Sequence, residues 1–173
     1  MRFDLDKATE ILRQTPYTLQ RMLDGLSDEW TASSEDKENW APYDVVGHLI
    51  HGEETDWIPR AEIVLGQEPN RTFDKYDRLA QFEKSRGNPL GDLLTEFAHL
   101  RSVNLERLAG WQLTDEQLQL TATHPALGEV TLEQLLAAWV VHDLNHIRQI
   151  ATCMARKYET AVGPWKQYLS ILQ

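Results

Sequence analysis

Apolar residues recur at three- and four-residue spacing in four long stretches of this chain, with polar residues between them. That spacing places the apolar side chains on one face of a helix, so it predicts four amphipathic helices. They cover about residues 4–25, 42–65, 90–108 and 131–154. Pro42 suits the first turn of the second helix and Gly66 suits its end, whereas Pro16 is expected to kink or interrupt the first helix.

The segments between these helices are polar or rich in turn-forming residues. No stretch shows the alternation of a strand, and no internal repeat is present. Five shorter features are expected: a polar surface connection over residues 27–39, an amphipathic piece over 74–85, a helical turn near 114–116, a loop at 123–125, and a last short helix over 165–172 packed on the bundle. The pattern therefore predicts an all-α four-helix bundle with additional short helices.

The composition fits one packed domain over residues 1–173, because 42% of the residues are hydrophobic and 25% are charged. The formal net charge of −10, without a gathering of basic residues along the sequence, argues against a nucleic-acid partner. The longest apolar run, Leu135 to Val141, is too short to cross a bilayer, and the charged N-terminus does not resemble a signal peptide. The single Cys153 cannot form an internal disulfide, so we expect a cytoplasmic protein without a membrane partner.

Histidines on the predicted helices are the main chemical signal. His142 and His146 lie four residues apart in the apolar stripe of the last long helix, so both rings project from one face, about 6 Å apart along the axis. A zinc-like ion needs at least three protein ligands. His48, on the apolar side of the second helix, is the best third candidate. The competing interpretation is that each ring is a core histidine satisfied by one hydrogen bond.

The other histidines and the cysteine receive different interpretations. His51 lies on a neighbouring strip of the second helix and is expected at the rim of the site, although a fourth ligand and a proton donor remain open alternatives. His99 falls off the apolar stripe of its helix and His124 precedes a proline, so both are expected to face solvent. Cys153 lies about 10 Å along the axis from His146, too far to bind the same ion, and is expected in the core.

Acidic and aromatic residues near the histidines suggest supporting roles. Asp143 makes the pair a His-Asp-x-x-His motif, whose carboxylate is shorter than that of the zinc-protease motif His-Glu-x-x-His, so protease chemistry is not favoured. Instead, Asp143 is expected to orient a ligand or to pair with an adjoining helix. The acidic run of Glu53, Glu54 and Asp56 is expected to form a solvated face, with a supporting role like that of Asp143 as the open alternative. The tryptophans are expected mainly to pack, and Trp139, one turn before His142, is the candidate for lining a substrate pocket.

Two segments of the chain resemble the DinB-like superfamily of damage-inducible proteins. They are Trp-Ala-Pro-Tyr-Asp-Val-Val-Gly-His-Leu at residues 40–49 and Trp-Val-Val-His-Asp-Leu-Asn-His-Ile-Arg-Gln at residues 139–149. Residues 73–87 and 162–165 look like the same group, so the likeness spans nearly the whole chain.

The resemblance implies a four-helix bundle in which one histidine of the second helix and the His-x-x-x-His pair bind a divalent metal, commonly zinc or nickel. Those positions are His48, His142 and His146 in this sequence. Some relatives are thiol transferases that use low-molecular-weight thiols, and one branch isomerises maleylpyruvate. Related bundles often pair, so the resemblance also implies a homodimer, although the sequence shows no isolated apolar face for its interface.

Three functional hypotheses follow. The leading one is a metal-dependent enzyme that acts on a small molecule, as a hydrolase or a thiol S-transferase, because three histidines leave one coordination position open for water or a thiol. The second is a non-catalytic bundle tied together by the ion and serving as an interaction or dimerisation module, which a closed fourth ligand would favour. The third is a bundle with buried histidines and no metal. Nucleotide-binding and serine-hydrolase motifs are missing from the sequence.

Overall fold

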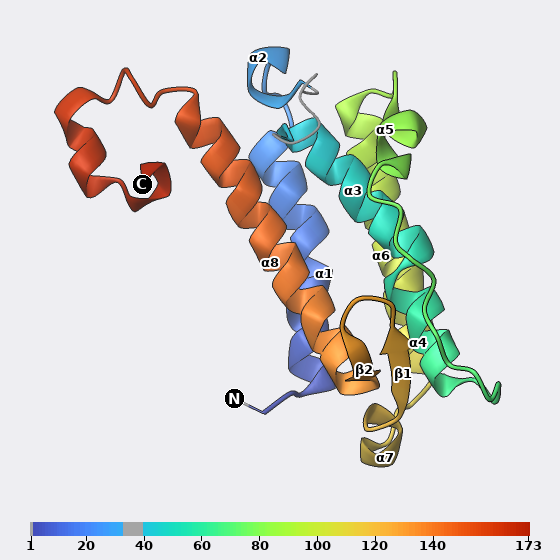
Figure 1. Cartoon of the computed structure of the whole chain (residues 1–173). Coiled ribbons are helices and arrows are strands. Elements are labelled where there is room, and N and C mark those ends of the chain that lie inside the picture. The colour runs from blue at the N-terminus through green and yellow to red at the C-terminus, as the bar shows by residue number, and fades with distance from the viewer. Residues whose placement is uncertain (1, 33–39) are drawn as a thin grey trace.

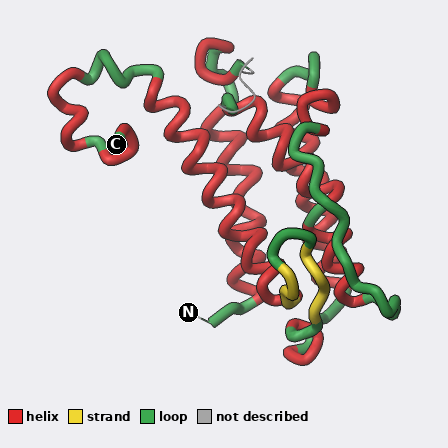
Figure 2. The backbone as a smooth tube through the Cα atoms, viewed as in Figure 1, coloured by secondary structure: helices red, strands yellow, loops and turns green. Residues whose placement is uncertain are grey.

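The computed structural model describes residues 2–32 and 40–173, and helices dominate it (Figure 2). The four long helices are α1 (Leu5–Leu23), α3 (Pro42–Thr55), α6 (Leu90–Gly110) and α8 (Leu132–Arg156). The shorter elements are α2 (Asp28–Thr31), α4 (Trp57–Leu65), α5 (Ala80–Ser85), α7 (Asp115–Leu118), β1 (Thr121–His124), β2 (Gly128–Thr131) and two 3₁₀ helices, η1 (Gly163–Tyr168) and η2 (Ser170–Leu172). The predicted all-α four-helix bundle with additional short helices is confirmed.

The long helices form a bundle in which α1 and α3 each pack against both α6 and α8 (Figure 1). Two clusters of buried apolar side chains fill its interior, one including Trp139 and Trp57 and the other including Phe97 and Leu19. This order makes α3 and α8 neighbours. Inward-facing side chains of these two helices therefore meet inside the bundle.

The second predicted helix is divided in two. It is helical as α3 up to Thr55, breaks at Asp56, and resumes as α4 until Gly66, which is its C-cap. Pro59 explains the break, because a proline ring collides with the carbonyl group four residues earlier, which here is that of Thr55, and cannot donate a hydrogen bond to it. The expected end at Gly66 is confirmed, and a single helix over 42–65 is wrong.

Pro16 does not interrupt α1, which continues through it. Because proline has no N–H, the carbonyl of Leu12 lacks its usual partner within the helix. The guanidinium of Arg101 takes that place, with Nη1 donating to the Leu12 oxygen over 2.7 Å. The proline thus exposes a backbone acceptor to the neighbouring helix α6.

The connecting segments partly follow the sequence-based expectation. In the polar connection predicted over 27–39, α2 occupies residues 28–31 and buries Thr31, while residues 33–39 lie outside the described part. The amphipathic piece over 74–85 is helical only as α5. The helical turn near 114–116 is confirmed as α7, with a capping box between Thr114 and Gln117.

A β-hairpin replaces the loop expected at residues 123–125. Its strands β1 and β2 are antiparallel, with Thr121 opposite Thr131 and His124 opposite Gly128. Gly128 has a positive φ of 77°, a conformation that glycine adopts without the steric cost of a side chain. The expectation of no strand was wrong, because two four-residue strands are too short for alternation to be visible.

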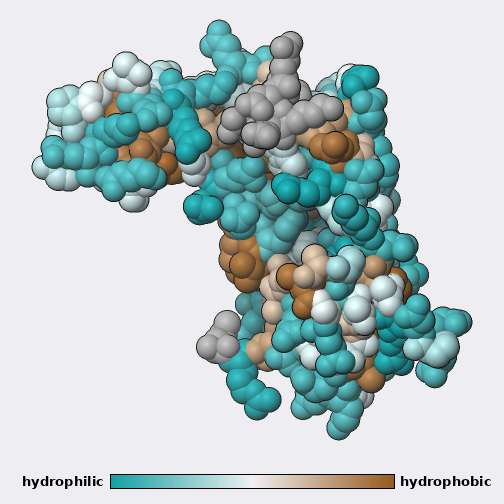
Figure 3. Space-filling model, viewed as in Figure 1, coloured by the Kyte–Doolittle hydropathy of each residue, from teal (hydrophilic) through white to brown (hydrophobic). Residues whose placement is uncertain are grey.

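The C-terminal segment stands away from the bundle as a separate lobe (Figure 3). The short helix expected over 165–172 is present as η1 and η2, and η2 lies against α8. The expected packing on the bundle is confirmed only for η2, where Leu172 is buried, whereas Trp165 of η1 is 71% exposed.

None of the described helices combines the length and the hydrophobicity that a bilayer crossing requires.

Candidate metal centre

Three histidine rings meet between α3 and α8. The Nε2 atom of His142 lies 3.0 Å from Nε2 of His48 and 3.0 Å from Nε2 of His146. These three residues form a group whose ligand atoms all lie within 4.8 Å of one another. His48 and His146 are buried, and His142 is partly buried. The structure therefore brings together all three residues that the sequence selected as metal ligands.

Local sequence features place these rings. Thr131 and Gln134 form a capping box that begins α8, and the helix then carries His142 and His146 on one face, four residues apart. On α3, Gly47 precedes His48. A Cβ atom at Gly47 would collide with the side chain of Ser85, so the glycine allows α5 to lie close against α3.

Two glutamines orient the outer histidines. His48 Nδ1 lies 3.0 Å from Oε1 of Gln81, and His146 Nδ1 lies 2.8 Å from Oε1 of Gln149. A carboxamide oxygen only accepts hydrogen bonds, so each Nδ1 carries the proton and donates it. Both Nε2 atoms therefore keep a lone pair, and both lone pairs point at His142. Such partners are typical of histidines that bind metal through Nε2.

Burial keeps the three rings neutral near pH 7. It lowers the pKa of His48 to about 3 and that of His142 to about 2, with a smaller contribution from the neighbouring histidines. The pKa of His146 is also lowered, mainly by burial. Metal ligands must be deprotonated. All three imidazoles meet this requirement before any ion binds.

The depressed pKa values predict that acid destabilises the metal-stripped protein. The unfolded chain binds protons at a histidine pKa near 6.5, whereas folded His48 and His142 resist protonation down to about pH 3 and 2. The contribution of these histidines to the free energy of unfolding is therefore fully present above pH 6.5 and is lost as the pH falls below that value. We expect each of these histidines to lower the free energy of unfolding by about 1 kcal/mol as the pH falls from 6.5 to 5.5.

Urea denaturation across this pH range measures the effect. A His99→Gln variant should show the same decrease in the free energy of unfolding with falling pH as the wild-type protein, because His99 is exposed on α6. A His48→Gln/His142→Gln variant should lose the share of this decrease that these two residues contribute, about 2 kcal/mol between pH 6.5 and 5.5. An equal decrease in all three proteins would show that the buried histidines are not its source.

The arrangement fits a tetrahedral divalent ion. Zinc–nitrogen bonds of 2.0–2.1 Å at tetrahedral angles separate neighbouring nitrogens by about 3.3 Å, close to the 3.0 Å found for two of the pairs. Without an ion, the single proton of His142 Nε2 can satisfy only one of the two lone pairs that face it. In the described ranges 2–32 and 40–173, no cysteine, carboxylate or further histidine joins the group.

Aromatic side chains surround the three rings. Trp40 lies 4.9 Å from the ring of His48 and stacks on that of His146, with 6.4 Å between centroids. Trp57 meets His142 edge-on at 5.0 Å. These contacts enclose the site with large apolar surfaces, which restrict water around it.

Several residues near the site differ from the sequence-based expectation. His51 is not at the rim: it is 5% exposed, packs against the ring of Tyr76, and stays outside the three-histidine group. Trp139 is completely buried against Trp57, so it does not line a pocket. Cys153 is partly exposed and lines a cavity, so it is not a core residue.

The two remaining histidines lie apart from the group. His99 is exposed on α6, as expected. His124 ends β1 and is partly buried, and its Nδ1 accepts hydrogen bonds from the backbone N–H groups of Ala126 and Leu127. It therefore closes the hairpin turn and does not simply face solvent.

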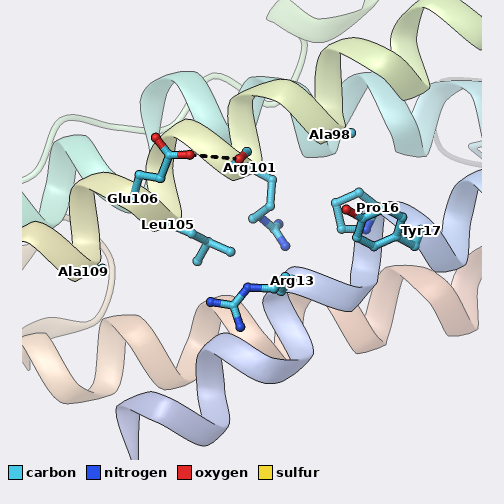
Figure 4. A pocket seen from close by; sticks show the side chains of 9 residues that line it. Arg13, Pro16, Tyr17, Ala98, Arg101, Leu105, Glu106 and Ala109 are labelled. Atoms are coloured by element: carbon cyan, nitrogen blue, oxygen red, sulfur yellow. Dashed lines mark hydrogen bonds between the residues drawn. The ribbon is translucent and has the colours of Figure 1, made fainter.

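A buried ionic cluster lies next to the metal centre. The guanidinium of Arg101 projects from α6 towards α1 (Figure 4) and forms ion pairs with Glu53 of α3 at 2.8 Å and Asp143 of α8 at 2.6 Å. Glu53 also accepts hydrogen bonds from Asn104 and from Nε1 of Trp139. Asp143 thus pairs with an adjoining helix, one of its two expected roles, while Glu53 is wrongly assigned to a solvated face.

Burial and ion pairing shift the pKa values of the residues in this cluster. Burial raises the pKa of the Glu53 carboxyl, and the nearby Arg101 guanidinium opposes that rise. The pKa of Arg101 is raised by the two carboxylates despite its burial. The cluster binds α3, α6 and α8 together, and through the Leu12 carbonyl it also reaches α1.

An all-α bundle with three converging histidines between two of its long helices defines a four-helix-bundle protein with a candidate metal centre. The model of the DinB superfamily matches residues 11–150, and the chain belongs to this superfamily. The resemblance seen in the sequence is therefore confirmed. A comparison with curated proteins finds no match.

Among solved structures, YfiT from Bacillus subtilis is similar to this chain. The TM-score is 0.74 and the sequence identity is 24%, over 88% of this chain and 87% of that chain. YfiT is described as a probable metal-dependent hydrolase with an unusual four-helix bundle topology. At this identity, the likeness shows a shared fold.

Proposed function

We propose that this protein is a divalent-metal-dependent hydrolase of a small molecule, with His48, His142 and His146 as the metal ligands. The observation that carries the proposal is the convergence of three neutral imidazoles without a fourth protein ligand among the described residues. Catalytic zinc sites typically combine three protein ligands with one exchangeable position, whereas structural sites are closed by four. The description of YfiT as a probable metal-dependent hydrolase supports the same reaction class.

The chain's own residues prepare the site for this chemistry. Gln81 and Gln149 hold two of the rings with their Nε2 lone pairs inward. Trp40 packs against the rings of His48 and His146, and Trp57 packs against that of His142. A bound divalent ion would lower the pKa of a water molecule at the open position and so supply a nucleophile near neutral pH.

Several expectations stay predictions within this proposal. Zinc and nickel are the expected metals, and a low-molecular-weight thiol is the alternative occupant of the open position, which would make the enzyme an S-transferase. The homodimer and the cytoplasmic location also stay predictions. A fourth ligand from His51 would have favoured a non-catalytic bundle, but His51 lies outside the histidine group.

Metal content and metal-dependent turnover test the proposal together. Protein purified without a histidine tag should contain close to one zinc or nickel ion per chain by elemental mass spectrometry. It should hydrolyse an activated ester such as p-nitrophenyl acetate, lose this activity with a chelator, and regain it on metal addition. Parallel assays with a thiol and an alkyl halide test S-transfer at the same site.

Two variants make the result specific. His142→Ala/His146→Ala should lose both the metal and the activity, whereas His99→Ala should keep both, because His99 is exposed and remote from the group. A wild-type protein that holds no metal and takes up none would overturn the proposal. Stoichiometric metal without hydrolysis or S-transfer would favour the metal-tied, non-catalytic bundle.

A further inference from the structure

A cavity of about 600 Å³ opens beside the metal centre. Small-molecule sites usually have volumes of about 300–1,000 Å³, so this one can hold a substrate. It is lined by Trp40 and by six residues of α8: Asn145, Arg148, Gln149, Thr152, Cys153 and Arg156. Their spacing of three and four residues puts the six on one strip of that helix.

Two lining residues connect this cavity to the histidines. Gln149 accepts the hydrogen bond of His146 Nδ1 at 2.8 Å. The indole of Trp40 stacks on the ring of His146, with an interplanar angle of 9°. A molecule in the cavity would therefore contact residues that themselves contact the candidate metal ligand His146.

The charge of the cavity is opposite to that of the protein. The chain has 27 acidic and 17 basic residues, yet the described residues that line the cavity include two arginines and no carboxylate. Arg78 adds a third guanidinium, which lies over the ring of Trp40 at 5.8 Å. This gathering of basic residues is not visible along the sequence, because Arg78 approaches the cavity only through its contact with Trp40, 38 positions earlier in the chain.

The two lining arginines face little competition from carboxylates. Glu159, whose pKa is lowered mainly by its hydrogen bond with Lys166 and in part by the charge of Arg156, forms its ion pair with Lys166. Arg148 and Arg156 are exposed, and within the described ranges neither forms an ion pair with a carboxylate. Arg148 makes one long hydrogen bond, of 3.4 Å, to Oδ1 of Asn145. Guanidinium groups match carboxylate and phosphate oxygens with paired N–H donors. Two of them on one wall favour an anion.

We propose that this cavity binds the oxyanion group of the substrate, a carboxylate or a phosphate, through Arg148 and Arg156. The substrate is then a small anionic molecule whose reacting bond lies at the three histidines. This assignment rests on the proposed function for the reaction. Anion binding itself depends on the arginines and not on the metal.

Binding to the metal-stripped full chain tests the assignment. Succinate, inorganic phosphate and the neutral succinamide are titrated by isothermal calorimetry. We expect one site per chain for succinate or phosphate, with at least tenfold weaker binding of succinamide. Whichever of the two anions binds with the lower Kd indicates whether the substrate carries a carboxylate or a phosphate. Iodoacetamide should alkylate Cys153 more slowly when the anion is bound, because this cysteine lines the cavity.

Two matched variants locate the site. Arg148→Gln/Arg156→Gln should weaken anion binding at least tenfold, whereas Arg2→Gln/Arg21→Gln removes the same charge from exposed positions outside the cavity and should leave it unchanged. Equal affinity for succinamide, absence of anion binding, or full binding by the first variant would overturn the assignment. Because no metal is present, each of these failures is distinct from a failure of the metal centre.

Discussion

Replacing Arg101 by methionine is expected to lower the free energy of unfolding by about 3–5 kcal/mol, because it leaves two buried carboxylates without their cation. Glu53 and Asp143 each lie within 3.0 Å of the Arg101 guanidinium. The same change leaves the Leu12 carbonyl without a donor, since Pro16 provides none. Urea denaturation of the metal-stripped protein measures the loss.

A control on the same helix separates burial from charge. Arg107 of α6 pairs with Glu62 at the surface, so Arg107→Met should cost about 0–1 kcal/mol. Where Arg101→Met fails to fold, Arg101→Met/Glu53→Gln/Asp143→Asn should recover part of the stability, because it removes both stranded charges. A cost for Arg101→Met no larger than that of Arg107→Met would contradict the expected role of the cluster.

Periodicity predicted the long helices well because each buries one continuous face. The buried residues of α8 include Leu132, Leu136, Trp139, His146 and Ile150, which all belong to the predicted stripe. The same method missed the break at Asp56, because apolar residues continue across it. Pro59 was the available signal, since a proline excludes the helical hydrogen bond of the residue four positions earlier.

The buried ionic cluster also left a signal in the sequence. Arg101 and Asn104 fall on the apolar stripe of α6 that contains Phe97, Leu105 and Leu108. A charged residue at an inward position needs a buried partner, but periodicity along one helix does not identify it. Glu53 and Asp143 lie 48 and 42 positions away from Arg101, so only the packing of α6 against its neighbours reveals the pairing.

The candidate metal centre was predictable in part for the same reason. The spacing of His142 and His146 places them together on any helix. The approach of His48, 94 positions from His142, depends on α3 and α8 being neighbours. The resemblance to the superfamily supplied that information. Gln81 was not predictable, because it approaches His48 only through the contact of α5 with Gly47. Gln149 could have been found, since it lies three residues after His146 on the same helix.

The ionic cluster and the histidines act on the same pair of helices. Glu53 lies on α3 five residues after His48, and Asp143 directly follows His142 on α8. Arg101 therefore holds α3 and α8 together close to the three rings. An ion bound by the histidines would add a second connection between the same helices, so metal binding should stabilise the folded chain directly.

Saturating metal is accordingly expected to raise the free energy of unfolding by about 4 kcal/mol when the free ion is a thousandfold above its Kd. Urea denaturation with zinc or nickel, compared with a chelator, measures the gain. His142→Ala/His146→Ala should lose it, because one histidine cannot hold the ion alone, while His99→Ala should retain it in full. If the stability of the wild-type protein were the same with metal and with chelator, the three rings would be core histidines that need no ion.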